Sequence, residues 1–244
     1  MNSAGEHDNM FYHLQEVSVK RDKRLVLDCI SLRMGSPSTI IIGANGGGKT
    51  TLLMTLAGLL PYAGKISLGT NEISSFPRKR MAQMVSFVPQ LFTPYLSISV
   101  RDFILLGKFP NLNWMGQFDQ KDKEDVDRIL QRLEIDHLAA QSIGKTSGGE
   151  LRKILLARAI AQNTPYILMD EPTQGLDPLQ QQKFYGLVPL LLEENKKVIM
   201  VGHDTSAVRS GQFDVVAIRG GQIWFEGKPD KLPTNWIEDL YKPS

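Results

Sequence analysis

The chain has 244 residues, of which 42% are hydrophobic, so it can form one large domain or one core with an inserted subdomain. Lys and Arg number 28 and Asp and Glu 26, and the net charge of +2 gives no electrostatic case for a nucleic-acid partner. Cys29 has no second cysteine to pair with, which favours a reducing compartment and a buried, apolar surrounding for its thiol.

Membrane insertion is not expected, because no apolar run reaches the ~18 residues that a spanning helix needs. The longest runs, Leu52–Leu60 and Leu187–Leu192, are short or interrupted by Thr, Gly and Pro. Residues 1–10 are polar and lack the basic start and apolar stretch of a secretion signal, so we expect a flexible tail there. The sequence thus predicts a cytoplasmic protein that needs a separate partner for any role at a membrane.

The first elements after the tail predict a β-rich start. Leu14–Val19 and Leu25–Leu32 could form an antiparallel layer. Thr39–Ile42 is apolar throughout, as is typical of a buried strand, and a glycine-rich turn and a helix from about Thr50 to Ala57 follow it.

The glycine-rich turn, Gly43–Thr50, fits the phosphate-loop pattern G-x-x-x-x-G-K-[ST]. Glycines let backbone N–H groups turn toward phosphate oxygens, and the start of the following helix adds partial positive charge. Lys49 can supply a cation for the β- and γ-phosphates, and the Thr50 hydroxyl can ligate Mg²⁺. The alternative is an ordinary glycine-rich turn in which Lys and Thr follow by chance, but its position between a strand and a helix favours a nucleotide-binding site.

The middle of the chain changes character after a strand at Ser86–Val88. Residues 91–160 have few strand signals, and apolar residues recur at helical spacing, as in Val126–Leu133, so we expect an inserted helical subdomain. Within it, Ser147–Glu150 precedes an amphipathic helix and could be a second anion-binding helix start. It also fits S-x-x-E, an ordinary capping box, and the residues alone leave both interpretations open.

Two carboxylates, Asp170 and Glu171, end the apolar run Tyr166–Met169. Ligands of open α/β sheets bind beyond the carboxyl ends of strands, so Asp170 suits a Mg²⁺ ligand and Glu171 a base that activates water. The alternative is a solvated charge pair that caps a helix.

The remaining elements complete an α/β pattern. Val198–Val201 predicts another buried strand, and His203 after it is by itself more typical of a structural residue than of a ligand. Gly220 and Gly221 predict a hairpin between Val215–Ile218 and Gln222–Glu226. Strands that alternate with helices predict an α/β core with a mostly parallel sheet.

The phosphate loop, Ser147–Glu150 and the acidic pair, in this order, resemble the nucleotide-binding domains of ATP-binding cassette (ABC) transporters. Gln90 matches the glutamine loop of that family, Gly175–Asp177 its aspartate loop and His203 its switch histidine. The resemblance covers the chain after its tail, residues 11–244. Glu150 stands where the family usually has Gln, and Ala44 replaces a common proline.

The resemblance implies a P-loop NTPase core from residues 11–90 and 161–244, with residues 91–160 as a helical subdomain that carries Ser147–Glu150. It implies a homodimer enclosing two Mg·ATP, permease subunits in the membrane and, indirectly, a substrate-binding protein. The chain would then lie on the inner face of the cell membrane. Nucleic acid is not an expected partner.

The resemblance also assigns site residues. The implied ATP ligands of one copy are Gly43, Ala44, Asn45, Gly46, Gly47, Gly48, Lys49, Thr50 and Thr51. The implied ligands from the second copy are Ser147, Gly148, Gly149, Glu150 and Asp177. The implied catalytic residues are Glu171, His203, Gln90 and Lys49, and the implied Mg²⁺ ligands are Thr50, Gln90 and Asp170.

One departure concerns the adenine base. The family usually stacks adenine on an aromatic residue, where this chain has Lys20 or Arg21, while Phe11 and Tyr12 come too early. A cation can still lie over the face of the base. The aromatic residues of the inserted region are expected either to form its core or to line a groove for a permease helix. They are Phe92, Tyr95, Phe103, Phe109, Trp114 and Phe118.

The pattern Leu105–Pro110, followed by an acidic helix, looks like the branch that imports iron-siderophores, haem, cobalamin or metal chelates, and so does Pro61–Ile66. Alternatives are another transporter class and a non-transport ABC ATPase, although the long coiled-coil insertion or second cassette of the latter is absent. A GTPase is disfavoured because Asn195–Val198 lacks the acid of the guanine-reading motif. A catalytically inactive regulatory module is disfavoured because the chain has all four of Lys49, Asp170, Glu171 and His203.

Overall fold

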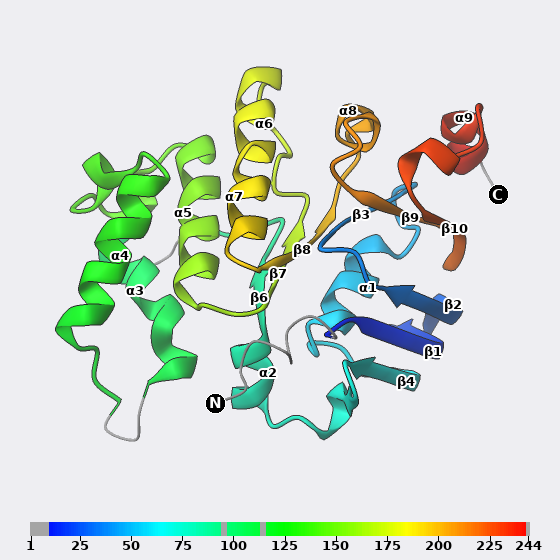
Figure 1. Ribbon diagram of the computed structural model, residues 1–244, viewed down its shortest axis with the longest axis horizontal. Coiled ribbons are helices and arrows are strands. Elements are labelled where there is room, and N and C mark those ends of the chain that lie inside the picture. Colours follow the sequence, from blue (N-terminus) through cyan, green and yellow to red (C-terminus); the bar gives the residue numbers. More distant parts are fainter. Residues whose placement is uncertain (1–9, 94–96, 113–115, 243–244) are drawn as a thin grey trace.

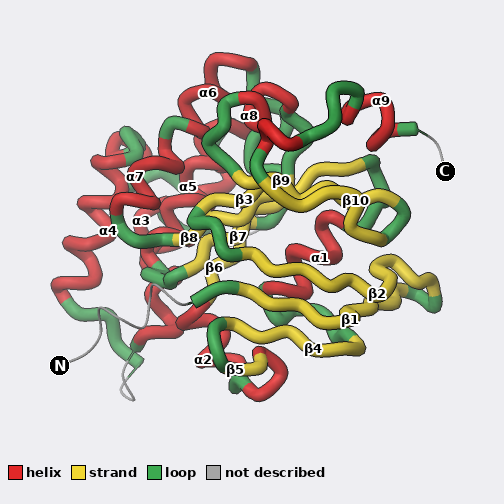
Figure 2. The backbone as a smooth tube through the Cα atoms, turned by 45° about the vertical axis from the view of Figure 1, so that its right-hand side comes forward, coloured by secondary structure: helices red, strands yellow, loops and turns green. Residues whose placement is uncertain are grey.

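A computed structural model describes residues 10–93, 97–112 and 116–242. Within them, the N-terminal sheet is antiparallel, in the order β2–β1–β4–β5 (Figure 1 for the first three strands, Figure 2 for all four). Its strands are β1 (Tyr12–Arg21), β2 (Arg24–Met34), β4 (Ala63–Leu68) and β5 (Asn71–Glu72).

The second sheet has the order β10–β9–β3–β8–β7–β6, and all of its neighbouring strands are parallel except the terminal hairpin β9–β10. Its strands are β3 (Ser38–Gly43), β6 (Val85–Val88), β7 (Tyr166–Asp170), β8 (Lys197–Val201), β9 (Asp214–Arg219) and β10 (Gln222–Gly227). The two sheets and the helical region between β6 and β7 confirm the predicted fold class.

Helices cover both faces of the parallel sheet. Those of the core are α1 (Lys49–Leu56), α2 (Arg78–Met84), α6 (Pro178–Tyr185), α7 (Leu187–Glu193), α8 (Thr205–Arg209) and α9 (Trp236–Tyr241). Those between β6 and β7 are α3 (Val100–Leu105), α4 (Gln120–Arg132) and α5 (Gly148–Ala161). None of the helices described here is both long enough and apolar enough to cross a bilayer.

The alternation of side chains along β3 divides the core into two parts. Ile41 packs with Leu52, Leu53 and Leu56 of α1, which lies between the two sheets (Figure 2). Ile40 and Ile42, on the other face, belong to the cluster that includes α3, α5 and α7. Since both faces of β3 are covered, its apolar residues are buried on both sides, as its unbroken apolar run predicts.

Cys29 is exposed, so the expectation of a buried thiol was wrong. A bulge explains this: in the pairing of β1 with β2, Val17 faces Ile30 and Val19 faces Leu27, and the register shifts between them. Leu27 and Ile30 are therefore both buried, although a regular strand would point them to opposite faces. Cys29 adopts a φ of 49°, and its N–H donates to Ser18 Oγ at 2.9 Å.

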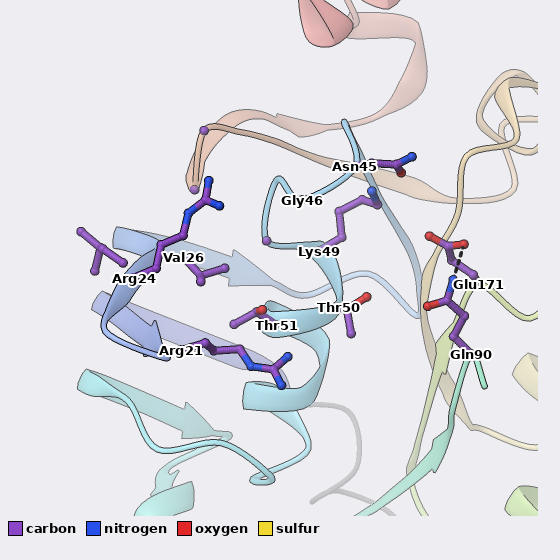
Figure 3. A pocket seen from close by; sticks show the side chains of 14 residues that line it. Arg21, Arg24, Val26, Asn45, Gly46, Lys49, Thr50, Thr51, Gln90 and Glu171 are labelled. Carbon is purple, nitrogen blue, oxygen red and sulfur yellow. Dashed lines mark hydrogen bonds between the residues drawn. The ribbon is translucent and has the colours of Figure 1, made fainter. Parts of the chain in front are cut away.

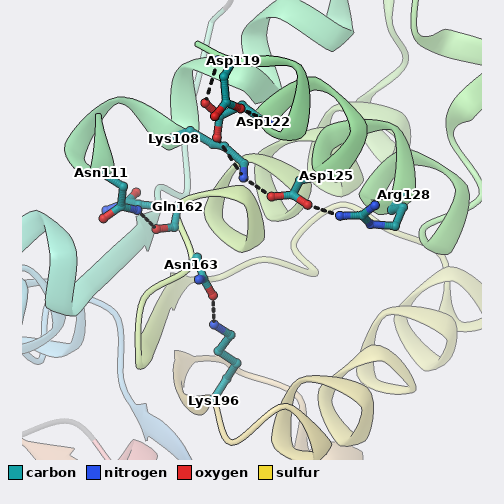
Figure 4. Close-up of polar contacts among 9 residues, drawn as sticks. All are labelled: Lys108, Asn111, Asp119, Asp122, Asp125, Arg128, Gln162, Asn163 and Lys196. Carbon is teal, nitrogen blue, oxygen red and sulfur yellow. Dashed lines mark hydrogen bonds and ion pairs between the residues drawn. The ribbon is translucent and has the colours of Figure 1, made fainter. Parts of the chain in front are cut away.

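Ion pairs connect the 3₁₀ segment Leu106–Asn111 to α4 (Figure 4). Lys108 Nζ lies 3.3 Å from Asp122 Oδ1 and also contacts Asp125, which pairs in turn with Arg128. These pairs give a structural reason for the sequence pattern of Leu105–Pro110 followed by an acidic helix.

The aromatic residues of this region divide between core and surface. Phe92 and Phe103 pack together, with ring centroids 5.3 Å apart, and Phe118 packs on the same core. Phe109 is 67% exposed. For these residues the core interpretation is therefore correct except at Phe109. Tyr95 and Trp114 lie outside the described residues, as does nearly all of the expected tail.

Candidate nucleotide site

The loop Gly43–Thr50 runs from the end of β3 into the start of α1, and its shape depends on glycine. Gly48 has a φ of 105°, and a Cβ placed there would lie 2.6 Å from Leu27 Cδ2. Gly43 has a φ of 150°, and a Cβ there would lie 2.2 Å from the carbonyl oxygen of Ile218. Side chains would therefore clash with β2 and β9, and glycine lets the loop lie against them.

Lys49 is only 5% exposed, and its ammonium group bends back over the loop. Its Nζ donates to the carbonyl oxygens of Gly43 at 2.9 Å and Ala44 at 3.0 Å. Burial lowers the pKa of Lys49, while the negative charges of Glu171 and Asp170 partly oppose that change. A phosphate group would offer this cation a stronger partner than the two neutral carbonyls.

Asp170 and Thr50 meet beside the loop. The Thr50 hydroxyl donates to Asp170 Oδ1 at 3.0 Å, which joins the carboxyl end of β7 to the first turn of α1. The described residues contain no cluster of three or more His, Cys, Asp and Glu side chains that could hold a metal alone. Oxygen ligands of this kind and number fit Mg²⁺, which usually takes one or two protein ligands together with waters and substrate phosphates.

Asp170 is 3% exposed, and burial raises the pKa of its carboxyl group, although the hydrogen bond from Thr50 lowers it. Because the folded state binds this proton more tightly than the unfolded state, stability falls as pH rises from about 4 through the raised pKa. We therefore expect Asp170→Asn to raise the melting temperature of the nucleotide-free protein at pH 7. In calorimetry the gain should shrink as pH falls toward 4. A gain that is independent of pH would contradict this explanation.

Glu171 lies between two other predicted site residues, Gln90 and His203, and Figure 3 shows its contact with Gln90. Its Oε2 accepts a hydrogen bond from Gln90 Nε2 at 3.0 Å, and its Oε1 lies 2.7 Å from His203 Nε2. Gln90 follows β6 and His203 follows β8, while Glu171 follows β7 between them. Three neighbouring parallel strands thus bring an amide, a carboxylate and an imidazole together at their carboxyl ends.

The backbone of Glu171 is also unusual. Its φ is 45°, a left-handed conformation that non-glycine residues seldom adopt, and its N–H donates to the carbonyl oxygen of Val201 at 3.1 Å. Such strain is common at functional sites.

A pocket of 480 Å³ extends from Gln90 and Glu171 to the hairpin β1–β2. Arg21 and Arg24 line its far end, whereas Lys20 is not among its lining residues (Figure 3). Of the two cations expected near adenine, the structure therefore places Arg21 at the pocket. Arg24 was not predicted, but it pairs with Arg21 across the hairpin, so correct strand pairing would have identified it.

The segment Ser147–Glu150 does not line this pocket. Ser147 Oγ accepts from the N–H of Glu150 at 3.3 Å, and Glu150 Oε2 accepts from the N–H of Ser147 at 2.7 Å, so the capping box is formed. The bond from Ser147 lowers the pKa of Glu150. Asp177 is likewise outside the pocket, where it caps α6 by accepting from Gln180 N–H at 3.0 Å.

A phosphate loop that begins at the end of β3 and an acidic pair at the end of β7, on a mostly parallel sheet, define a P-loop nucleoside triphosphatase. The family model described as ABC transporter matches residues 30–174, more than half of the chain. The chain belongs to the ABC transporter family, as an ATP-binding cassette that hydrolyses ATP.

Similar proteins agree with this assignment. The probable iron chelatin transport ATP-binding protein of Helicobacter pylori strain 26695 is 30% identical over 237 residues, which cover 95% of this chain and 93% of that protein. The petrobactin import ATP-binding protein FpuD of Bacillus anthracis is 32% identical, with 93% and 85% covered. An inward-facing ABC transporter of the metal-chelate type superimposes with a TM-score of 0.80 at 25% identity, covering 96% of this chain and 89% of that one.

Proposed function

We propose that this chain is the ATPase subunit of a solute importer, and that two copies close around two Mg·ATP in a head-to-tail arrangement. The observation that supports the proposal is the separation on one chain of two helix starts with glycine-rich sequences. Gly43–Thr50 lies at the pocket where α1 begins, whereas Ser147–Glu150 lies where α5 begins, outside the pocket. If both bind one triphosphate, a second copy must supply the second helix start.

The roles within the pocket follow from its contacts. Lys49 and the loop N–H groups would bind the β- and γ-phosphates, and Thr50 and Asp170 would hold Mg²⁺, which neutralises charge on the phosphates. Glu171 would take a proton from the attacking water. Gln90 and His203 each contact one of its two oxygens in this structure, and each oxygen keeps a second lone pair for the water.

Permease subunits would bind the region between β6 and β7, on the cytoplasmic face of the membrane. Phe109 is 67% exposed and Leu91, next to Gln90, is 82% exposed. A helix of the permease would cover these apolar side chains. Contact at Leu91 would also place the permease one residue from the proposed active site.

The transported solute is proposed from the relatives, whose names specify siderophore and iron chelatin transport and hemin and zinc import. We favour an iron-siderophore, haem, cobalamin or other metal chelate. Uptake of labelled ferric siderophore, haem, cobalamin and zinc should be compared in cells that carry the wild-type gene or Lys49→Ala. Loss of siderophore, haem or cobalamin uptake supports the proposal, and loss of zinc uptake alone would contradict it.

The dimer is tested with purified protein. In light scattering, Glu171→Gln with Mg·ATP should have the mass of a dimer, because ATP is bound but not consumed. The double variant Glu171→Gln with Ser147→Arg should stay monomeric, because a bulky cation then occupies the proposed contact with the second ATP. A monomer at saturating Mg·ATP without the Ser147 change would argue against the shared site.

A further inference from the structure

We propose that Arg152 is a positioning residue, which ties α5 to the catalytic carboxylate by holding the backbone of Gln90. The proposal rests on the proposed role of Glu171 as the base. Arg152 lies on α5, two residues after Glu150, and it reaches across to the loop that follows β6.

The geometry forms a continuous chain of contacts. Arg152 Nη1 donates to the carbonyl oxygen of Gln90 at 2.5 Å and lies 3.5 Å from that of Pro89. The side chain of Gln90 then donates to Glu171 Oε2 at 3.0 Å. One arginine therefore connects the helix that begins with Ser147 to the group proposed to activate water.

The electrostatics agree with this placement. Arg152 is partly buried, and burial lowers the pKa of its guanidinium, while the negative charge of Glu171 acts in the opposite direction. An arginine remains protonated under these conditions.

Arg152 holds the backbone of this loop from α5. The carbonyl oxygens of Pro89 and Gln90 both lie near Arg152, while the side chain of Gln90 also donates to Gln174 Oε1 at 3.0 Å. Leu91, the next residue, is 82% exposed. The backbone position of Gln90 therefore depends in part on α5, and a movement of α5 against the sheet would shift the amide relative to Glu171.

This arrangement gives Arg152 a specific task. When a nucleotide held by another copy contacts Ser147–Glu150, α5 takes a defined position, and Arg152 transmits that position to Gln90. The base is then aligned only when the second copy is in place. Arg152 touches neither nucleotide nor water in this scheme, so its effect must pass through Gln90.

The test is a double-mutant cycle on the ATPase rate of the full-length protein. Arg152→Ala should lower kcat by about tenfold, the rate equivalent of one lost hydrogen bond to a charged group, with little change in the KM for ATP. Arg152→Lys should restore part of the loss. In a Gln90→Ala background, Arg152→Ala should cause no further loss, because the side chain that it positions is gone.

Lys153→Ala is the matched control. Lys153 is the next residue of α5, and its Nζ donates to the carbonyl oxygen of Leu133 at 3.1 Å, away from Gln90. Its kcat should stay at the wild-type value. If Arg152→Ala costs the same factor with and without Gln90, the coupling through Gln90 is refuted. If Arg152→Ala raises the KM for ATP, or lowers the melting temperature along with kcat, the role of Arg152 is only structural. Neither result would affect the base role of Glu171, which Glu171→Gln tests separately.

Discussion

Replacing Glu171 by glutamine is expected to slow ATP hydrolysis by about 10²–10⁴-fold, the usual contribution of a general base, while ATP still binds. Glutamine keeps the size of the side chain and can still bond to Gln90 and His203, but it cannot accept a proton from water. The rate should be measured under single-turnover conditions, and ATP affinity by calorimetry. The hydrolysis rate should fall, while the dissociation constant of ATP should not change.

A matched control is Glu193→Gln, which changes the same functional group at the exposed end of α7. It should leave both quantities unchanged. Hydrolysis at the wild-type rate in Glu171→Gln would remove Glu171 as the base, and weakened ATP binding would indicate a structural role instead.

Lys49→Ala is expected to weaken ATP binding by about 30- to 1000-fold. The ammonium group is buried at the loop, and removing one partner of a buried, hydrogen-bonded charge pair typically costs ~2–4 kcal/mol or more. Since its present partners are backbone carbonyls of Gly43 and Ala44, the nucleotide-free fold should lose much less than the complex. Titration calorimetry with Mg·ATP measures the change in affinity.

Lys121→Ala, at an exposed position of α4, controls for the loss of one positive charge. Its affinity for ATP should match that of the wild type. Equal affinities of Lys49→Ala and the wild type would place the phosphates elsewhere.

The parts of the site that come from one continuous stretch could be predicted from the sequence. Gly43–Thr50 carries its own strand, turn and helix signals, and β3 and α1 begin and end within one or two residues of their predicted bounds. Asp170 and Glu171 likewise follow directly from an apolar run. In both stretches local residue types determine the backbone, apart from the left-handed conformation of Glu171.

Features that depend on strand pairing could not be predicted. Nothing around Cys29 marks the bulge that exposes it, because the bulge exists only in the register of β1 against β2. The meeting of Gln90, Glu171 and His203 requires β6, β7 and β8 to be neighbours, and only the family resemblance suggested that. Arg152 gave no signal, since a cation on an amphipathic helix usually faces water.

The central claim is that each triphosphate is bound by two protomers, and mixing two defective chains tests it most directly. In a Glu171→Gln background, one chain carries Lys49→Ala and the other Ser147→Arg. Neither should retain ATP alone, because every site in either homodimer has one defective half. In the mixture, one site joins an intact phosphate loop to an intact Ser147–Glu150 segment from the other chain. The account predicts that each mixed pair retains Mg·ATP at one of its two sites after gel filtration, which is about half of full occupancy. A mixture that retains no more nucleotide than the separate variants would contradict it.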